Sequence, residues 1–127
     1  MKKILVIEDE QDIRDSIQEI VEMAGYAVTP IANGAAGIKE LMHNPFDLII
    51  CDIMMPEMDG LTAMNHIREK DKQTGKRTPI IVLTAHAIKG DRERFIDAGA
   101  DGYVSKPIQV ELLRAEIELL QKNKILQ

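Results

Sequence analysis

"DLIICDIMMPEMDG", residues 47–60, places four consecutive apolar residues, Leu48 to Cys51, directly before the carboxylate of Asp52. A short apolar run bounded by turn-forming residues is typical of a buried strand, and a proline and an Asp-Gly pair supply the turn residues here. The stretch therefore predicts a buried strand that ends on an acid. That acid is either a polar residue at the edge of a sheet or the reactive group of the protein.

Four further short apolar runs accompany this strand, at Ile4–Ile7, Ala27–Ile31, Ile80–Leu83 and Gly102–Val104. Amphipathic segments lie between and after them, at Ile13–Ala24, Gly34–Met42, Gly60–Lys70, Ile88–Ala98 and Val110–Leu120. Near-continuous apolar strands that alternate with helices predict a parallel sheet covered on both faces. The expected fold is α/β, a flavodoxin-like (βα)5 doubly wound five-stranded parallel sheet with strand order 2-1-3-4-5. The polar stretch Lys70–Pro79 is expected to be a solvated loop.

Chain length and composition limit the classes of function. The 127 residues suit one domain, expected to span residues 1–127 with no output domain. A net charge of -5 and the lack of tryptophan argue against direct binding of nucleic acid. Because no apolar segment approaches membrane-spanning length and the single Cys51 lies in a predicted strand, we expect a cytoplasmic protein that does not bind a membrane.

Chemically active residues gather at the carboxyl ends of the predicted strands, where ligands bind in open parallel sheets. Glu8 and Asp9 follow the first strand, Asp52 ends the third, Thr84 ends the fourth, and Lys106 follows the fifth. Clustered carboxylates repel one another unless a cation compensates them, and Mg²⁺ suits such a set. A carboxylate nucleophile beside a divalent cation, an ammonium and a hydroxyl predicts phosphoryl transfer onto Asp52.

Each of these residues also has an ordinary structural explanation. The acids after the first strand complement the dipole of the following helix, whereas Asp52 could cap a loop and Lys106 could be a surface lysine. The functional interpretation depends on all of them occurring together at one edge of the sheet.

Four stretches, "ILVIEDE", "DLIICDIMMPEMDG", "PIIVLTAHA" and "DGYVSKPI", occur in this order at separations that resemble the response-regulator receiver domain of two-component and phosphorelay signalling. The sequence is especially similar to receivers of hybrid histidine kinases. The resemblance implies that Asp52 is the phosphoacceptor, that Asp9 binds Mg²⁺ directly, and that Glu8 holds a metal-bound water. It further implies metal contacts from the carboxylate of Asp52 and from the backbone carbonyl of Met54.

The resemblance also assigns the parts of a switch. Thr84 and Lys106 match the switch hydroxyl and the phosphate-binding lysine, Tyr103 matches the switch aromatic, and Met54 and His86 occupy positions that tune phosphoaspartate lifetime. The bond between Lys106 and the following proline is typically cis in the family. The implied partners are a histidine kinase or histidine phosphotransfer domain, and a homodimer or output partner at the surface of the fourth helix, fifth strand and fifth helix. Catalysis would be limited to self-phosphorylation and slow autodephosphorylation, so the protein is not expected to be an enzyme.

Three alternatives remain open from the residues. An aspartyl-phosphate phosphatase would need a second acid at position 54, where this chain has methionine. A flavodoxin-like FMN binder would need a phosphate loop after the first strand, whereas "EDEQD" would repel a phosphate. A receiver-like module that binds partners without phosphorylation would not require the full set of site residues. The "TGKRT" stretch, residues 74–78, does not complete a nucleotide-binding loop, because position 70 is lysine where the motif requires glycine and Lys76 is followed by arginine where it requires a hydroxyl residue.

Overall fold

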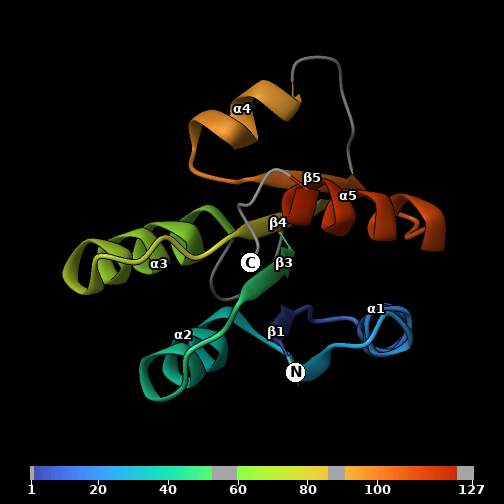
Figure 1. The fold of residues 1–127 in the computed structure, drawn as a ribbon, viewed down its shortest axis with the longest axis horizontal. Helices are drawn as coiled ribbons and strands as arrows, with labels where there is room; N and C mark the ends of the chain where they lie inside the picture. The colour runs from blue at the N-terminus through green and yellow to red at the C-terminus, as the bar shows by residue number, and fades with distance from the viewer. Residues whose placement is uncertain (1, 53–59, 86–90, 123–127) are drawn as a thin grey trace.

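Five strands and five helices alternate along the chain in a computed structural model that describes residues 2–52, 60–85 and 91–122 (Figure 1). The first two pairs are β1 (Lys3–Ile7) with α1 (Gln11–Met23) and β2 (Ala27–Ile31) with α2 (Gly34–His43). The next are β3 (Leu48–Asp52) with α3 (Gly60–Thr74) and β4 (Ile80–Thr84) with α4 (Asp91–Asp97). Strand β5 (Gly102–Ser105) and helix α5 (Val110–Lys122) complete the set.

The strands form one parallel sheet in the order β2-β1-β3-β4-β5, which confirms the fold expected from the sequence. Strand β1 lies between β2 and β3, with Ile4 opposite Val28 on one side and Leu48 on the other. Strand order reverses at this point, so the crevice between β1 and β3 is the expected place for a ligand. Among the described residues, no helix is both long and apolar enough to cross a membrane.

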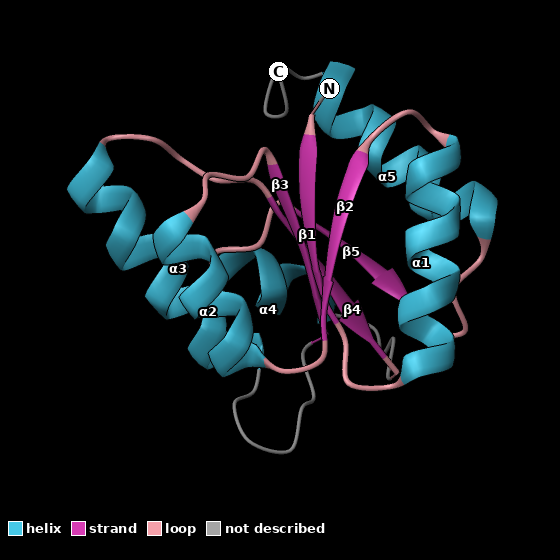
Figure 2. Cartoon of the chain, turned by 90° about the horizontal axis from the view of Figure 1, so that it is seen from below, coloured by secondary structure: helices cyan, strands magenta, loops and turns pink. Residues whose placement is uncertain are grey.

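Alternate residues of each strand point to opposite faces of the sheet and build two separate cores. On β1, Ile4 and Val6 pack with helices α1 and α5, whereas Leu5 and Ile7 pack with the layer of α2, α3 and α4. Figure 2 shows these two helical layers on either side of the sheet. The central strands β3 and β4 are buried along their whole length, which explains why their sequences are continuously apolar.

Helix α3 continues to Thr74, four residues beyond its predicted end, so the expectation of a solvated loop is wrong for residues 70–74. Gly75 ends the helix with a positive φ of 76°, a conformation that glycine adopts without strain. The helix predicted at Ile88–Ala98 is observed as α4 over Asp91–Asp97; residues 86–90 lie outside the described part of the chain. Gly25, with a φ of 97°, follows α1 as predicted.

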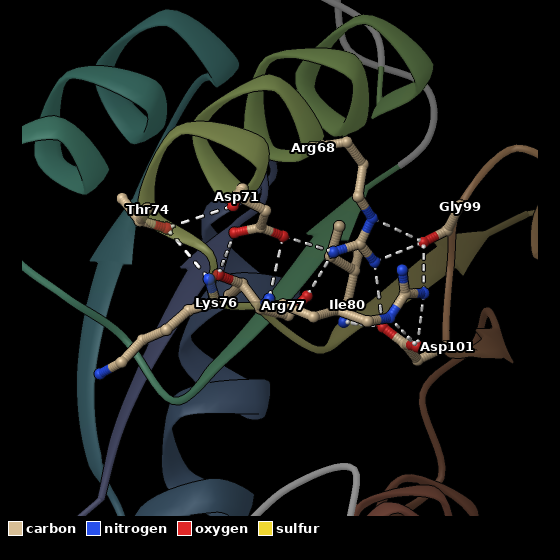
Figure 3. A network of polar contacts seen from close by, with 9 residues as sticks. Arg68, Asp71, Thr74, Lys76, Arg77, Ile80, Gly99 and Asp101 are labelled. Carbon is tan, nitrogen blue, oxygen red and sulfur yellow. Dashed lines mark hydrogen bonds and ion pairs between the residues drawn. The ribbon is translucent and has the colours of Figure 1, made fainter.

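Polar contacts at the amino-terminal edge of β4 explain the extra helical turn (Figure 3). Arg68 forms ion pairs with Asp71 at 2.8 Å and with Asp101 at 3.1 Å, and it also donates to the carbonyls of Thr78 and Gly99. Asp71 in turn accepts from the backbone amide and hydroxyl of Thr78. These contacts tie the end of α3 to the loop before β4 and to the turn before β5. We call Arg68, Asp71, Arg77, Thr78 and Asp101 the amino-edge clasp.

Candidate functional site

The opposite edge of the sheet carries the residues singled out from the sequence. Strand β1 leads into Glu8 and Asp9, β3 ends on Asp52, β4 ends on Thr84, and β5 leads into Lys106. The backbone amide of Lys106 donates to the carbonyl of Thr84 at 2.7 Å, which holds the segment after β5 against the end of β4. The parallel register therefore brings residues distant in sequence to one place.

The ammonium of Lys106 lies between two buried carboxylates. Its Nζ is 2.8 Å from Glu8 Oε1 and 3.1 Å from Asp52 Oδ2. The side chains of Glu8 and Asp52 are 0% and 3% exposed, and that of Lys106 is 13% exposed, so these contacts form with little water present. The peptide bond between Lys106 and Pro107 is cis.

Asp9 completes an acidic cluster with Glu8 and Asp52. One carboxylate oxygen from each of the three residues lies within 4.8 Å of the others, and only Asp9 is exposed to solvent. Oxygen donors this close, with one side open to water, suit Mg²⁺, which takes one or two carboxylates and keeps several waters. The donor set therefore fits this ion.

The cluster shifts the proton affinity of its members. Burial raises the pKa of Glu8 from 4.5 to about 7, although contacts with Lys106 and with the backbone amide of Glu10 oppose the rise. Burial has the opposite effect on a cation and lowers the pKa of Lys106. The hydrogen bonds of Lys106 to Glu8 and Asp52 outweigh this effect and leave its pKa raised. Partial burial raises the pKa of Asp9, yet its contacts with Glu8, with the backbone, with Asp52 and with Lys106 leave it below its usual value.

Other residues implied by the resemblance are placed as follows. Thr84 is buried at the end of β4. Tyr103 is partly buried on β5 and packs against Phe95 of α4, with ring centroids 6.0 Å apart and a 50° angle between the rings. Met54 and His86 lie outside the described residues.

One contact at this edge was not expected from the sequence. Arg14, in the first turns of α1, donates from Nη1 to the backbone carbonyl of Glu8 at 2.8 Å and to that of Asp9 at 3.4 Å. The acidic residues near Arg14 in the sequence suggest a salt bridge to a carboxylate instead. Only the three-dimensional course of the backbone between β1 and α1 shows that the guanidinium donates to backbone carbonyls.

Comparison with known families decides what kind of domain presents this edge. The sequence model of the response regulator receiver domain matches residues 4–118. The chain belongs to this family. The receiver resembles the transcriptional regulatory protein DltR of Streptococcus agalactiae, with 36% identity over 124 residues, which cover 98% of this chain and 54% of that protein. It also resembles the hybrid signal transduction histidine kinase G of Dictyostelium discoideum, with 41% identity over 114 residues, which cover 88% of this chain and 3% of the kinase.

Solved structures agree with the assignment. The receiver superimposes on the chemotaxis protein CheY4 of Vibrio cholerae with a TM-score of 0.82 and 30% identity, covering 96% of this chain and 98% of that one. The receiver domain of sensor histidine kinase PA1611 from Pseudomonas aeruginosa, a structure with a magnesium ion coordinated in its active site cleft, gives a TM-score of 0.78 and 34% identity. This match covers 92% of this chain and 95% of that one. The chain spans about half the length of DltR and a small part of the kinase.

Family membership separates the classes of function left open by the sequence. Receiver domains bind Mg²⁺ in an acidic pocket and take phosphoryl groups from histidine kinases. The chain therefore carries a receiver domain of the two-component signalling family. The phosphatase and FMN-binding alternatives are not supported.

Proposed function

We propose that this receiver is a phosphorylation switch in which Asp52 accepts a phosphoryl group from the phosphohistidine of a histidine kinase or a histidine phosphotransfer domain. The observation that carries the proposal is the position of Lys106, whose Nζ contacts Asp52 at 3.1 Å and Glu8 at 2.8 Å. A cation held against the acceptor is where the charge of an incoming phosphoryl group needs compensation. In this proposal Asp9, Glu8 and Asp52, together with the backbone carbonyl of Met54, would hold Mg²⁺.

The transfer needs an in-line displacement at phosphorus. An oxygen of the Asp52 carboxylate attacks a phosphohistidine whose other ring nitrogen is protonated, and the bond between phosphorus and the histidine nitrogen breaks. The nitrogen leaves with the electron pair, giving an acyl phosphate and a neutral imidazole that keeps this proton. Bound Mg²⁺ supplies charge neutralisation for the phosphoryl oxygens. Lys106 then exchanges a carboxylate partner for a phosphoryl oxygen, and the Thr84 hydroxyl donates a hydrogen bond to another. Met54 and His86, which occupy positions that tune this lifetime in the family, would influence how long the phosphoaspartate lasts.

The same exchange would reach a distant surface through β4 and β5. Thr84 moves toward the phosphoryl group and Tyr103, which is packed on Phe95, moves inward, so the surface of α4, β5 and α5 shifts its population between two states. Exposed apolar side chains on this surface, Ile96 at 41% and Leu112 at 48%, suit an output partner or a second copy of the chain.

The phosphohistidine donor would dock beside α1. A hollow of about 320 Å³ between α1 and α5 is lined by Ile20, Met23, Ile108 and Val110 among others, and Met23 is 80% exposed. The hollow also has three polar lining residues, and Ile108 lies two residues after Lys106, so a donor docked there would lie next to the segment that carries Lys106.

Intact-protein mass spectrometry tests the proposal. After incubation with Mg²⁺ and acetyl phosphate, the wild type should gain one base-labile phosphoryl group, whereas Asp52→Asn should gain none. Asp12→Asn, which neutralises an exposed acid of α1, is the matched control and should be phosphorylated like the wild type. If the wild type gains no mass, beryllium fluoride binding distinguishes rapid hydrolysis from a failure to react. Failure of both would leave a receiver-like module that binds partners without phosphorylation.

A further inference from the structure

The loop between β1 and α1, residues 8–10, carries two of the clustered carboxylates, and a side chain of α1 holds its backbone. Arg14 Nη1 donates to the carbonyl of Glu8 at 2.8 Å and to that of Asp9 at 3.4 Å. One guanidinium nitrogen thus bridges two consecutive carbonyls directly beside the acidic cluster.

These carbonyls belong to the two peptide planes that flank the Cα atom of Asp9. Because a peptide unit is planar, fixing both carbonyl directions fixes the φ and ψ of Asp9 and therefore the direction in which its side chain leaves the backbone. Glu8 has other anchors, since its amide donates to the carbonyl of Ile31 and its buried carboxylate is paired with Lys106. Asp9 is exposed, so packing restrains it less and the contacts from Arg14 matter more.

We propose that Arg14 is a positioning residue for Mg²⁺, which holds the peptide planes around Asp9 so that its carboxylate faces those of Glu8 and Asp52 before the ion arrives. The inference rests on the proposed function, because it requires the acidic cluster to bind Mg²⁺. Groups that orient metal ligands without touching the metal contribute about tenfold to a hundredfold in metal affinity.

The positive charge of Arg14 should weaken Mg²⁺ binding, whereas its positioning role should strengthen it. The direction in which the affinity changes when Arg14 is replaced therefore tests the proposal. A guanidinium beside the cluster repels Mg²⁺, so if its charge were its main influence, its removal would tighten binding. If Arg14 only supported the start of α1, its removal would leave Mg²⁺ affinity unchanged. Of the three effects, only the loss of the orientation of the Asp9 carboxylate predicts weaker Mg²⁺ binding.

Isothermal titration of the metal-free protein with Mg²⁺ measures the affinity directly. Arg14→Met keeps most of the aliphatic stem and should weaken Mg²⁺ binding by about tenfold. Arg114→Met removes the same charge from an exposed position on α5 and should change the affinity by less than about twofold. Arg14→Lys returns a positive charge and a nitrogen donor, and it should bind Mg²⁺ more tightly than Arg14→Met, the reverse of the order that charge repulsion predicts.

Hydrogen exchange of the Glu10 amide, which donates to Glu8 Oε2 at 3.1 Å, provides a readout without metal. It should be several-fold faster in metal-free Arg14→Met than in the wild type, because the loop loses a restraint. Equal or tighter Mg²⁺ binding by Arg14→Met would overturn this inference alone. A wild type that binds no Mg²⁺ would overturn the proposed function and this inference with it.

Discussion

Neutralising Glu8 should remove a pH dependence from the stability of the metal-free protein. Its carboxyl has a pKa raised from 4.5 to about 7, chiefly by burial, and its side chain is fully buried. Between these two values the folded state holds a proton that the unfolded chain releases. The free energy of unfolding attributable to Glu8 is therefore fully present below the lower value and is lost as pH rises to about 7.

The size of the change in unfolding free energy follows from the rise in the pKa of Glu8. Each tenfold change in proton affinity is worth about 1.4 kcal/mol, so Glu8 should cost the wild type about 3 kcal/mol between about pH 4.5 and about pH 7. Glu8→Gln keeps the shape and stays neutral. The stability advantage of this variant over the wild type should be about 3 kcal/mol larger at about pH 8 than at about pH 5.

Urea denaturation followed by far-ultraviolet circular dichroism in the presence of a chelator measures the difference. Glu10→Gln, which neutralises the adjacent exposed carboxylate, should follow the wild type within about 0.5 kcal/mol at both pH values. Parallel pH profiles for the wild type and Glu8→Gln would refute the reasoning, because they would mean that the buried carboxyl is ionised throughout. Mg²⁺ favours the ionised form, so its addition should stabilise the wild type most at the higher pH.

Three further perturbations test other parts of the argument. Asp101→Asn should lower the free energy of unfolding by about 2 kcal/mol and the melting temperature by about 7 °C, because the largely buried Arg68 loses one of its two acidic partners. Glu69→Gln, in an exposed pair, should cost less than about 0.5 kcal/mol in the same melts. Mg²⁺ at about a hundredfold over its dissociation constant should stabilise the wild type by about 3 kcal/mol in urea titrations, and an equal gain in Asp9→Asn would contradict the assigned ligand. Lys106→Ala should accept a phosphoryl group without the amide chemical-shift changes over α4, β5 and α5 that accompany phosphorylation of the wild type, whereas an unchanged pattern would remove its role in the switch.

Much of the fold was predictable because the central strands are buried on both faces. Burial along their whole length leaves a continuous apolar signal at Leu48–Cys51 and Ile80–Leu83, and the chain order of strands and helices then restricts the topology. The end of α3 was not predictable in this way. Its last turn is polar, and the contacts that stabilise it come from Asp101, which lies 33 residues from Arg68. Hydrophobic periodicity in the sequence does not indicate such non-local contacts, although Gly75 marks where the helix ends.

The candidate site also contains residues that the sequence predicts and a residue that it does not. Parallel register brings the ends of β1, β3 and β4 to one edge, so the meeting of Glu8, Asp52 and Thr84 follows from topology alone. The contacts of Arg14 depend on backbone carbonyls, which every residue carries, and no sequence pattern indicates which carbonyl a guanidinium reaches. Sequence reasoning therefore finds side chains that contact other side chains, and it overlooks a side chain whose partners are backbone carbonyls.

Charge is distributed unequally between the two edges of the sheet. In the amino-edge clasp the cations of Arg68 and Arg77 meet the acids Asp71 and Asp101 in equal number, with every pair at 3.1 Å or less. At the opposite edge Lys106 faces an acidic cluster of three carboxylates, and burial, together with the neighbouring acids Asp9 and Asp52, raises the pKa of Glu8 and costs stability. Neutralising an acid should therefore have opposite effects at the two edges, destabilising in the clasp and stabilising in the cluster. The deficit of positive charge is what Mg²⁺ would fill, so the balanced edge holds the fold together while the other stays available for binding.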